Sequence, residues 1–310
     1  MRGSSRVGAV VVVMASVVLG LQPTTAAAAP GCAHVTVTEV VPSSTPTGWS
    51  ENVGYDADGN LWVSRILENV VERRDQQGRV TARVRVESPG AVRLGPDGLL
   101  YIASGDSPVN MLPGSPLVGK ILRIDPRMPS APASVFARGL GMPNGLAVDR
   151  TGDVYVSDGR LGVVRIRPDG SIDRAWSAAA PKNLTLSATS NGTGINGAVI
   201  VGRDLYATLT MSATGRVLRV PLADPAASSV AADLTTPLPG VLDDLTAVGP
   251  GQLAVSSTTG QVHLVDLGTD RICTTNVGQP VTALAVIPGS TGRLVAGTES
   301  GALLTLSIGR

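Results

Sequence analysis

The chain has 310 residues, of which 43% are hydrophobic and 16% charged, so it is a compact globular chain and not an intrinsically disordered one. Its formal net charge of +1 excludes a strong electrostatic attraction to nucleic acid or to an anionic membrane. Aromatic residues make up only 3%, so the core must be built mainly from Val, Leu, Ile and Ala. The 37 Gly and 22 Pro indicate many turns, as a many-stranded protein requires.

The first 29 residues have the pattern of a cleaved secretory signal. Arg2 and Arg6 give a positive start, residues 7–21 are apolar and uncharged, and small residues follow as far as Pro30. The apolar run is shorter than the ~20 residues that a membrane-spanning helix needs, so an anchor is the weaker interpretation. We predict a signal peptide over residues 1–29 and a secreted, extracellular mature chain that has no membrane span.

One pattern recurs along the rest of the chain, in which a turn with Gly or Asp precedes a short apolar strand and further strands follow. Apolar residues 39 to 54 positions apart anchor the six copies: Leu61, Leu100, Val154, Leu205, Leu253 and Leu294. Strand-type repeats of ~40–50 residues are typical of propeller blades. We predict an all-β, six-bladed β-propeller of four-stranded blades over residues 30–310, and we expect no helix after the signal.

The sixth unit reaches the C-terminus without room for a fourth strand, while a strand-like segment over residues 34–41 precedes the first unit. We predict that this N-terminal strand joins the last blade and closes the ring, which removes exposed sheet edges. Closure would bring Cys32 next to Cys273 at the end of blade five. In an exported protein this pair predicts a disulfide that staples the closure, with two unpaired thiols as the alternative.

Polar residues occupy matching positions near the start of the innermost strands. When these strands are aligned on their last apolar residue, the positions four residues earlier hold Glu51, Gly90, Asn144, Asn196, Asp244 and Thr282. Carboxylate and amide oxygens at one end of the channel suit a hard divalent cation, above all Ca²⁺. Each residue alone would be an ordinary turn residue, but the shared register favours a metal site. The predicted ligands are Glu51, Asn144, Asn196 and Asp244, with Asp243 as an alternative to Asp244.

Several short motifs lie around these positions. Residues 142–149 (MPNGLAVD) with residues 154–158 (VYVSD), and residues 50–56 (SENVGYD) with residues 61–63 (LWV), are similar to motifs of the SMP-30/gluconolactonase/luciferin-regenerating-enzyme family. Asn196-Gly197 resembles a motif of the related diisopropyl-fluorophosphatase-like enzymes. The resemblance covers nearly the whole mature chain. It implies a six-bladed fold, a calcium ion in the channel and hydrolysis of lactones or phosphoesters.

The chain departs from the family pattern at two places. The usual Gly-Pro after the first glutamate is Asn52-Val53 here, and the usual glycine after the last aspartate is Leu245. These changes keep the ligand atoms and alter the local backbone.

The predicted chemistry uses Ca²⁺ as a Lewis acid on a carbonyl or phosphoryl oxygen. Asp244 would act as general base or nucleophile, with Glu51 as the alternate. His34 and His263 are interpreted as structural, and no Gly-x-Ser-x-Gly nucleophile motif occurs. The sequence therefore indicates carboxylate rather than histidine or serine catalysis.

Two long loops, residues 104–118 and 178–195, are expected to rim the channel mouth above the metal. They and the start of blade one supply the candidate substrate contacts, each with a plain solvated loop as the alternative interpretation: Trp49, Asp106, Asn110, Met111 and Asn183.

Three functions remain open from the sequence. The favoured one is a secreted, calcium-dependent lactonase or esterase-like hydrolase that acts as a monomer on a small molecule and does not bind nucleic acid. The second is a non-catalytic propeller that binds a ligand or partner and holds calcium structurally. The third is a strictosidine-synthase-like or quinone-dependent sugar-dehydrogenase-like enzyme.

Overall fold

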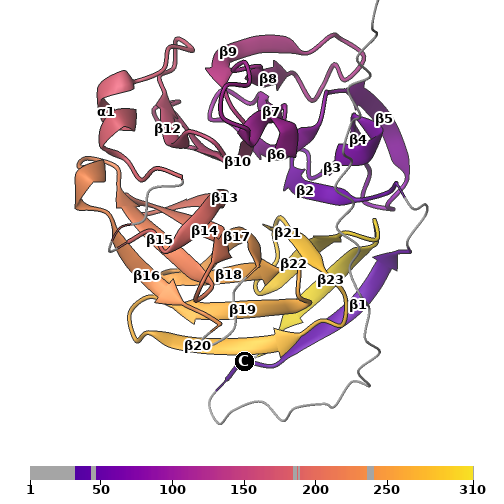
Figure 1. The fold of residues 1–310 in the computed structure, drawn as a ribbon. Helices are drawn as coiled ribbons and strands as arrows, with labels where there is room; N and C mark the ends of the chain where they lie inside the picture. Colours follow the sequence, from indigo (N-terminus) through magenta and orange to yellow (C-terminus); the bar gives the residue numbers. More distant parts are fainter. Residues whose placement is uncertain (1–31, 43–46, 184–186, 188, 236–240, 310) are drawn as a thin grey trace, which may run out of the picture.

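Six antiparallel sheets form a closed ring in the computed structural model, which describes residues 32–42, 47–183, 187, 189–235 and 241–309 (Figure 1). In five sheets the strands follow one another outward from the innermost, and in the sixth the first strand of the chain is outermost. The innermost strands of neighbouring blades contact one another all round the ring. The predicted all-β, six-bladed propeller is confirmed. The predicted signal peptide, residues 1–29, lies outside the described residues.

The first three blades contain eleven strands. Blade one consists of β2 (Ser50–Tyr55), β3 (Leu61–Arg65), β4 (Val70–Arg74) and β5 (Val80–Arg85). Blade two consists of β6 (Pro89–Leu94), β7 (Leu100–Ser104), β8 (Gly119–Ile124) and β9 (Ser134–Leu140). Blade three consists of β10 (Pro143–Val148), β11 (Val154–Asp158) and β12 (Gly162–Ile166).

The other three blades have four strands each. Blade four consists of β13 (Gly192–Val201), β14 (Asp204–Ser212), β15 (Arg216–Pro221) and β16 (Ser229–Asp233). Blade five consists of β17 (Leu242–Gly249), β18 (Gln252–Ser257), β19 (Gln261–Asp266) and β20 (Arg271–Asn276). Blade six consists of β21 (Val281–Val286), β22 (Arg293–Thr298), β23 (Leu303–Ile308) and β1 (Val35–Val41). Single turns of 3₁₀ helix lie at η1 (Ile66–Glu68), η2 (Pro108–Met111) and η3 (Pro225–Ala227).

Blade three departs from the predicted pattern, because helix α1 (Arg174–Ala179) lies outside β12 where a fourth strand was expected (Figure 1). The Asp173 side chain caps this helix by accepting a hydrogen bond from the Trp176 backbone N–H. The Trp176 ring packs edge-on against Tyr155, with 5.3 Å between the ring centroids. The expectation of no helix after the signal was therefore wrong at this position, where an N-cap and one buried aromatic side chain stabilise a short helix.

The hairpin turns explain why the repeated Asp/Gly motif marks each blade. In blade one the Asp56 carboxylate accepts hydrogen bonds from the backbone of Asp58 and Asn60 and from the Trp62 indole. Gly59 has a φ of 77°, which a residue with a side chain rarely adopts. The turn is thus specified locally, and it delivers the first two strands of the blade in register.

The core is divided among the blade interfaces. Six buried apolar clusters occur in the described part of the chain, and each combines residues from two neighbouring blades. The cluster between blades one and six contains Val53 and Val63 on one side and Ala283, Val295 and Leu303 on the other. Because the last interface is packed like the others, the ring is closed by hydrophobic contact as well as by strand pairing.

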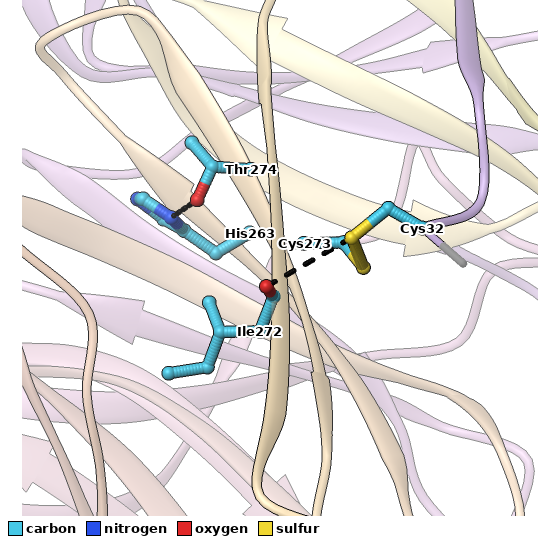
Figure 2. Close-up of a disulfide and its surroundings, with 5 residues drawn as sticks. All are labelled: Cys32, His263, Ile272, Cys273 and Thr274. Atoms are coloured by element: carbon cyan, nitrogen blue, oxygen red, sulfur yellow. Dashed lines mark hydrogen bonds between the residues drawn. A yellow bond between two sulfur atoms is a disulfide. The ribbon is translucent and has the colours of Figure 1, made fainter. Parts of the chain in front are cut away.

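The N-terminal strand closes the ring as predicted. β1 pairs antiparallel with β23, from Val35 opposite Ile308 to Val41 opposite Leu303, and the two strands lie side by side in Figure 1. Cys32, just before β1, forms the predicted disulfide with Cys273 of β20, with 5.5 Å between their Cα atoms (Figure 2). No helix in the described residues is long and apolar enough to cross a membrane.

The disulfide joins residues 241 positions apart, so its removal should destabilise the ring. In the double variant Cys32→Ser, Cys273→Ser we expect the free energy of unfolding to fall by about 2–5 kcal/mol, because the cross-link restricts the unfolded chain and holds β1 on blade six. Thermal unfolding of the variant and of the native protein, with and without reductant, measures this. A reductant-insensitive native Tm that equals the variant's would contradict it.

His263 of β19 is a buried, neutral side chain close to the disulfide (Figure 2). It is only 2% exposed, and its Nδ1 lies 2.9 Å from the Thr274 hydroxyl, while its Nε2 is buried without a hydrogen-bond partner in the described chain. Burial lowers the pKa of His263 from 6.5 to about 4. This placement supports a structural role and makes the imidazolium form costly.

Because the unfolded chain binds a proton at His263 at a higher pH than the folded chain does, stability is lost as the pH falls from 6.5 toward 4. Between about pH 7 and pH 5 we expect the native protein to lose about 2 kcal/mol more unfolding free energy than a His263→Phe variant. Urea denaturation of both proteins at the two pH values measures the difference. Parallel pH profiles would show that His263 does not contribute.

Candidate metal centre and active site

The candidate ligands lie at a shared irregularity of the innermost strands. Each of these strands shifts register near its start, as between Pro143, which pairs with Asp158, and Leu146, which pairs with Val156. Such a bulge redirects the side chain at its first residue. The equivalent first residues of the six blades are Glu51, Gly90, Asn144, Asn196, Asp243 and Thr282.

In blade five the residue at the equivalent position is Asp243, the alternative candidate, and Asp244 follows it. A second irregularity between Ala247 and Gly249 adds a residue near the end of β17. Because of this extra residue, counting four positions back from Val248 gives Asp244, whereas the position equivalent to Asn144 is the preceding residue, Asp243. Asp244 instead takes the position that glycine holds in blades three and four.

Asp244 lies in a network of its own inside the ring. Its carboxylate is 1% exposed and forms an ion pair at 3.2 Å with Arg93 of β6. It also accepts hydrogen bonds from the Asn52 amide and the Leu284 backbone N–H, both at 3.3 Å. Its charge is thus compensated by a guanidinium, and it ties blade five to blades one, two and six.

Glu51 and Asp106 are bridged by one amide. The Asn144 Nδ2 atom donates to Glu51 Oε1 at 2.9 Å and to Asp106 Oδ2 at 3.0 Å, while the Trp49 indole donates to Glu51 Oε2 at 2.8 Å. Burial raises the pKa of Glu51 to about 7 against the opposing effect of these hydrogen bonds. Burial, and then the charge of Glu51, raise the pKa of Asp106 well above its ordinary value. The structure thus brings Trp49 and Asp106 together with two of the candidate ligands.

Two side chains at this end of the ring have oxygen atoms that receive no hydrogen bond from the described residues. Asn196 Nδ2 donates to the Thr210 hydroxyl, but Asn196 Oδ1 is buried without a partner in the described chain. Asp243 is 5% exposed, and no described residue donates a hydrogen bond to its carboxylate. Burial, followed by the charges of Glu51 and Asp244, raises its pKa well above the ordinary value. A hard cation would satisfy these oxygens and offset the repulsion.

The donor set fits a cation that is held partly by amides. No group of three or more His, Cys, Asp or Glu side chains in the described residues is arranged to hold a metal by itself. A cation at this end of the channel would therefore depend on the amide oxygens of Asn144 and Asn196 in addition to carboxylates. This combination of neutral and anionic oxygen ligands suits Ca²⁺ better than a transition metal.

The remaining candidate substrate contacts are placed differently. Asn183 donates to the Asp158 carbonyl and accepts from the backbone N–H groups of Gly194 and Ile195, so its amide supports the first part of β13. Asn110 donates to the Gly105 carbonyl, next to Asp106. Met111 ends η2 and is partly exposed. The two asparagines thus support the loops that carry or precede site residues.

Arg93 and Ser88 are site residues that the sequence analysis did not single out. Ser88 has a φ of 38°, and its carbonyl accepts hydrogen bonds from the backbone N–H groups of Gly105 and Asp106. The Asn69 side chain holds Ser88 in this position, because its Oδ1 accepts a hydrogen bond from the Ser88 backbone N–H at an N–O distance of 2.8 Å. Arg93 could have been found from the sequence, because it is a charged residue in the apolar, channel-lining segment PGAVRL. No feature of the sequence indicates the left-handed conformation of Ser88.

Arg65 supports the segment that carries Trp49 and Glu51. This side chain is 2% exposed and forms a 3.1 Å ion pair with Glu72 inside blade one. Its Nη1 atom donates to the Gly48 carbonyl, the Ser50 hydroxyl and, across the seam with blade six, the Gly301 carbonyl. The position of Glu51 is therefore linked to ring closure.

No protein-family model matches the sequence, and no curated protein matches it. Solved structures do resemble the fold. A gluconolactonase from Xanthomonas campestris is 17% identical with a TM-score of 0.65, over 88% of this chain and 89% of that one. A calcium-binding protein, regucalcin, from Agrobacterium tumefaciens is 19% identical with a TM-score of 0.62, over 86% and 93%.

A third similar structure is the PQQ-bound aldose sugar dehydrogenase of Streptomyces coelicolor, which is 16% identical with a TM-score of 0.60, over 90% of this chain and 99% of that one. At such low identities these likenesses show that the chain shares the propeller fold of these proteins. They do not show its activity.

The buried carboxylates predict a stability that depends on both pH and cation. A raised folded-state pKa means that the folded protein holds a proton at Glu51 that the unfolded chain has lost, so stability falls as the pH rises from 4.5 to about 7. In chelator we expect the Tm to fall over this range. Saturating CaCl₂ should raise the Tm more at the upper end than at the lower end.

Differential scanning calorimetry of the native protein and of Glu51→Gln tests this. The variant lacks the titrating group, so its Tm in chelator should vary less with pH and should gain less from calcium. An equal calcium effect at both ends of the pH range would contradict the site.

Proposed function

We propose that the protein is a secreted, calcium-dependent hydrolase of the gluconolactonase type that acts on a lactone or an ester. The observation that carries this proposal is the set of oxygen-bearing side chains at equivalent bulges of four blades, one of which, Asn196, has a buried and unpartnered Oδ1. The likeness to gluconolactonase and regucalcin folds supports it. The disulfide is compatible with export to an oxidising compartment.

We assign the fourth ligand position to Asp243 and a supporting role to Asp244. The Asp243 carboxylate has no hydrogen-bond donor among the described residues, whereas Arg93 and Asn52 already engage Asp244. The proposed ligands are Glu51, Asn144, Asn196 and Asp243.

The chain's own residues can then perform the remaining tasks. When bound, Ca²⁺ would supply Lewis-acid polarisation of the scissile carbonyl. The Trp49 indole and the Asn144 amide hold Glu51 in one orientation, and Arg93 compensates the charge of Asp244, the residue next to Asp243. The Asp243 carboxylate, buried and without a hydrogen-bond donor, is the group best placed to accept a proton from water, with Glu51 as the alternate.

Matched substitutions at the two neighbouring aspartates test this assignment. In Asp243→Asn we expect turnover of a lactone or aryl ester to fall by about 10²-fold or more, because the proton acceptor is lost. Calcium should still bind, more weakly, because the amide oxygen remains. In Asp244→Asn we expect near-native turnover and a lower Tm, because Arg93 loses its buried counter-charge.

Calcium binding to the mature protein is measured by calorimetric titration. Hydrolysis of a panel of lactones and esters is measured with and without chelator. If Asp244→Asn lost turnover while Asp243→Asn kept it, Asp244 and not Asp243 would be the catalytic residue. Calcium binding without turnover would support the binding-module alternative. Absence of calcium binding would overturn the proposal.

A further inference from the structure

A separate hollow lies at the other end of blade one. Its volume is about 430 Å³, within the usual range for small-molecule sites, and blade one, blade six and β1 line it. Tyr55, in its wall, ends the strand that Glu51 nearly begins, so the two lie roughly 13 Å apart along β2. The hollow is therefore distinct from the candidate metal centre.

Aliphatic side chains from both sides of the seam that closes the ring form a large part of its wall. They include Val41, Leu61, Ile287, Val295 and Leu303. Such a wall suits a hydrocarbon chain more than a polyhydroxylated molecule.

Three of the polar side chains that line the hollow can only donate or remain donors near neutral pH. Arg74 is half-buried, its Nη atoms donate to Gly78 and Glu72, and its Nε has no accessible surface toward the hollow. Arg293 is exposed and forms no ion pair with any described residue, while burial raises the pKa of the nearby Tyr55 hydroxyl to about 12, so that it remains a donor.

The one carboxylate in the wall is already engaged. Asp75 accepts hydrogen bonds from the backbone of Gln77 and Arg79 and forms a 2.8 Å ion pair with the Arg79 side chain. The uncompensated charge of the hollow is therefore positive. A second hollow, beside Cys273, has a similar volume of about 470 Å³, but it includes Asp266 as well as Arg271 and lacks this imbalance.

We propose that the hollow at the seam binds a small amphipathic monocarboxylate of medium chain length. The carboxylate would lie against Arg293 and the Tyr55 hydroxyl, and the hydrocarbon chain would lie along the aliphatic wall. Charge-assisted hydrogen bonds supply the head-group recognition, and burial of methylene groups supplies affinity that grows with chain length.

Calorimetric titration of the full mature protein with octanoate, octanol and acetate tests the proposal. We expect octanoate to bind about tenfold or more tightly than octanol, which lacks the charge, and acetate not to bind measurably. Arg293→Gln should weaken octanoate by about tenfold and leave octanol unchanged. Tyr55→Phe should weaken it by a smaller factor, because a neutral donor is lost.

The matched control is Arg203→Gln, which removes the same charge from an exposed turn of blade four and should leave octanoate binding unchanged. Absence of octanoate binding, or equal weakening in Arg203→Gln and Arg293→Gln, would overturn the proposal. Octanoate binding that disappears on chelation or in Asp243→Asn would place the ligand at the channel mouth and would also overturn it. Octanoate binding is measured with and without calcium. A negative result for the octanoate site can therefore be told apart from a negative result for the proposed calcium-dependent hydrolysis.

Discussion

The structure depends on the contact between its first and last strands. Each blade buries apolar side chains only against its neighbours, so a ring that was open between blades six and one would expose two such faces. Pairing of β1 with β23, the shared apolar cluster and the disulfide all act at this boundary. Arg65 joins it to the functional end of the ring, because one guanidinium contacts both the blade-six turn and the segment before Glu51. Closure and site geometry are thus parts of one arrangement.

The site itself contains several buried carboxylates whose like charges repel one another. Glu51, Asp106 and Asp243 are all nearly inaccessible; the charge of Glu51 raises the pKa of both Asp106 and Asp243, while a single guanidinium, Arg93, pairs with Asp244. Arg93 stands three residues further along β6 than Gly90, so the channel passes from an acidic end to a compensated one. A divalent cation at the acidic end would complete the charge balance, since no described cationic side chain does so there.

The fold could be predicted from the sequence because it rests on local, repeated signals. The Asp/Gly turns, the strand spacing, the leftover strand at residues 34–41 and the two cysteines each specify a contact that the structure contains. The site could be predicted only in part. The equivalence of Glu51, Asn144 and Asn196 could be recognised by aligning the innermost strands on their last apolar residue. The extra residue between Ala247 and Gly249 was not, since a bulge depends on pairing with β18, and the choice between Asp243 and Asp244 therefore stayed open.

Blade six also constrains how the protein can be made. Its inner three strands belong to the last part of the chain and its outer strand to the first described part, so the longest-range contact in the molecule is also the one that completes it. A chain that crosses a membrane N-terminus first must carry β1 unpaired until β23 emerges. During that interval the edges of blades one and six are open to other chains, and Cys32 has no native partner. Export, as proposed above, would require a first segment that does not associate with other chains while it is unpaired, and β1, whose residues after Val35 are mostly exposed and whose sequence mixes Val with Thr and Glu, would meet that requirement.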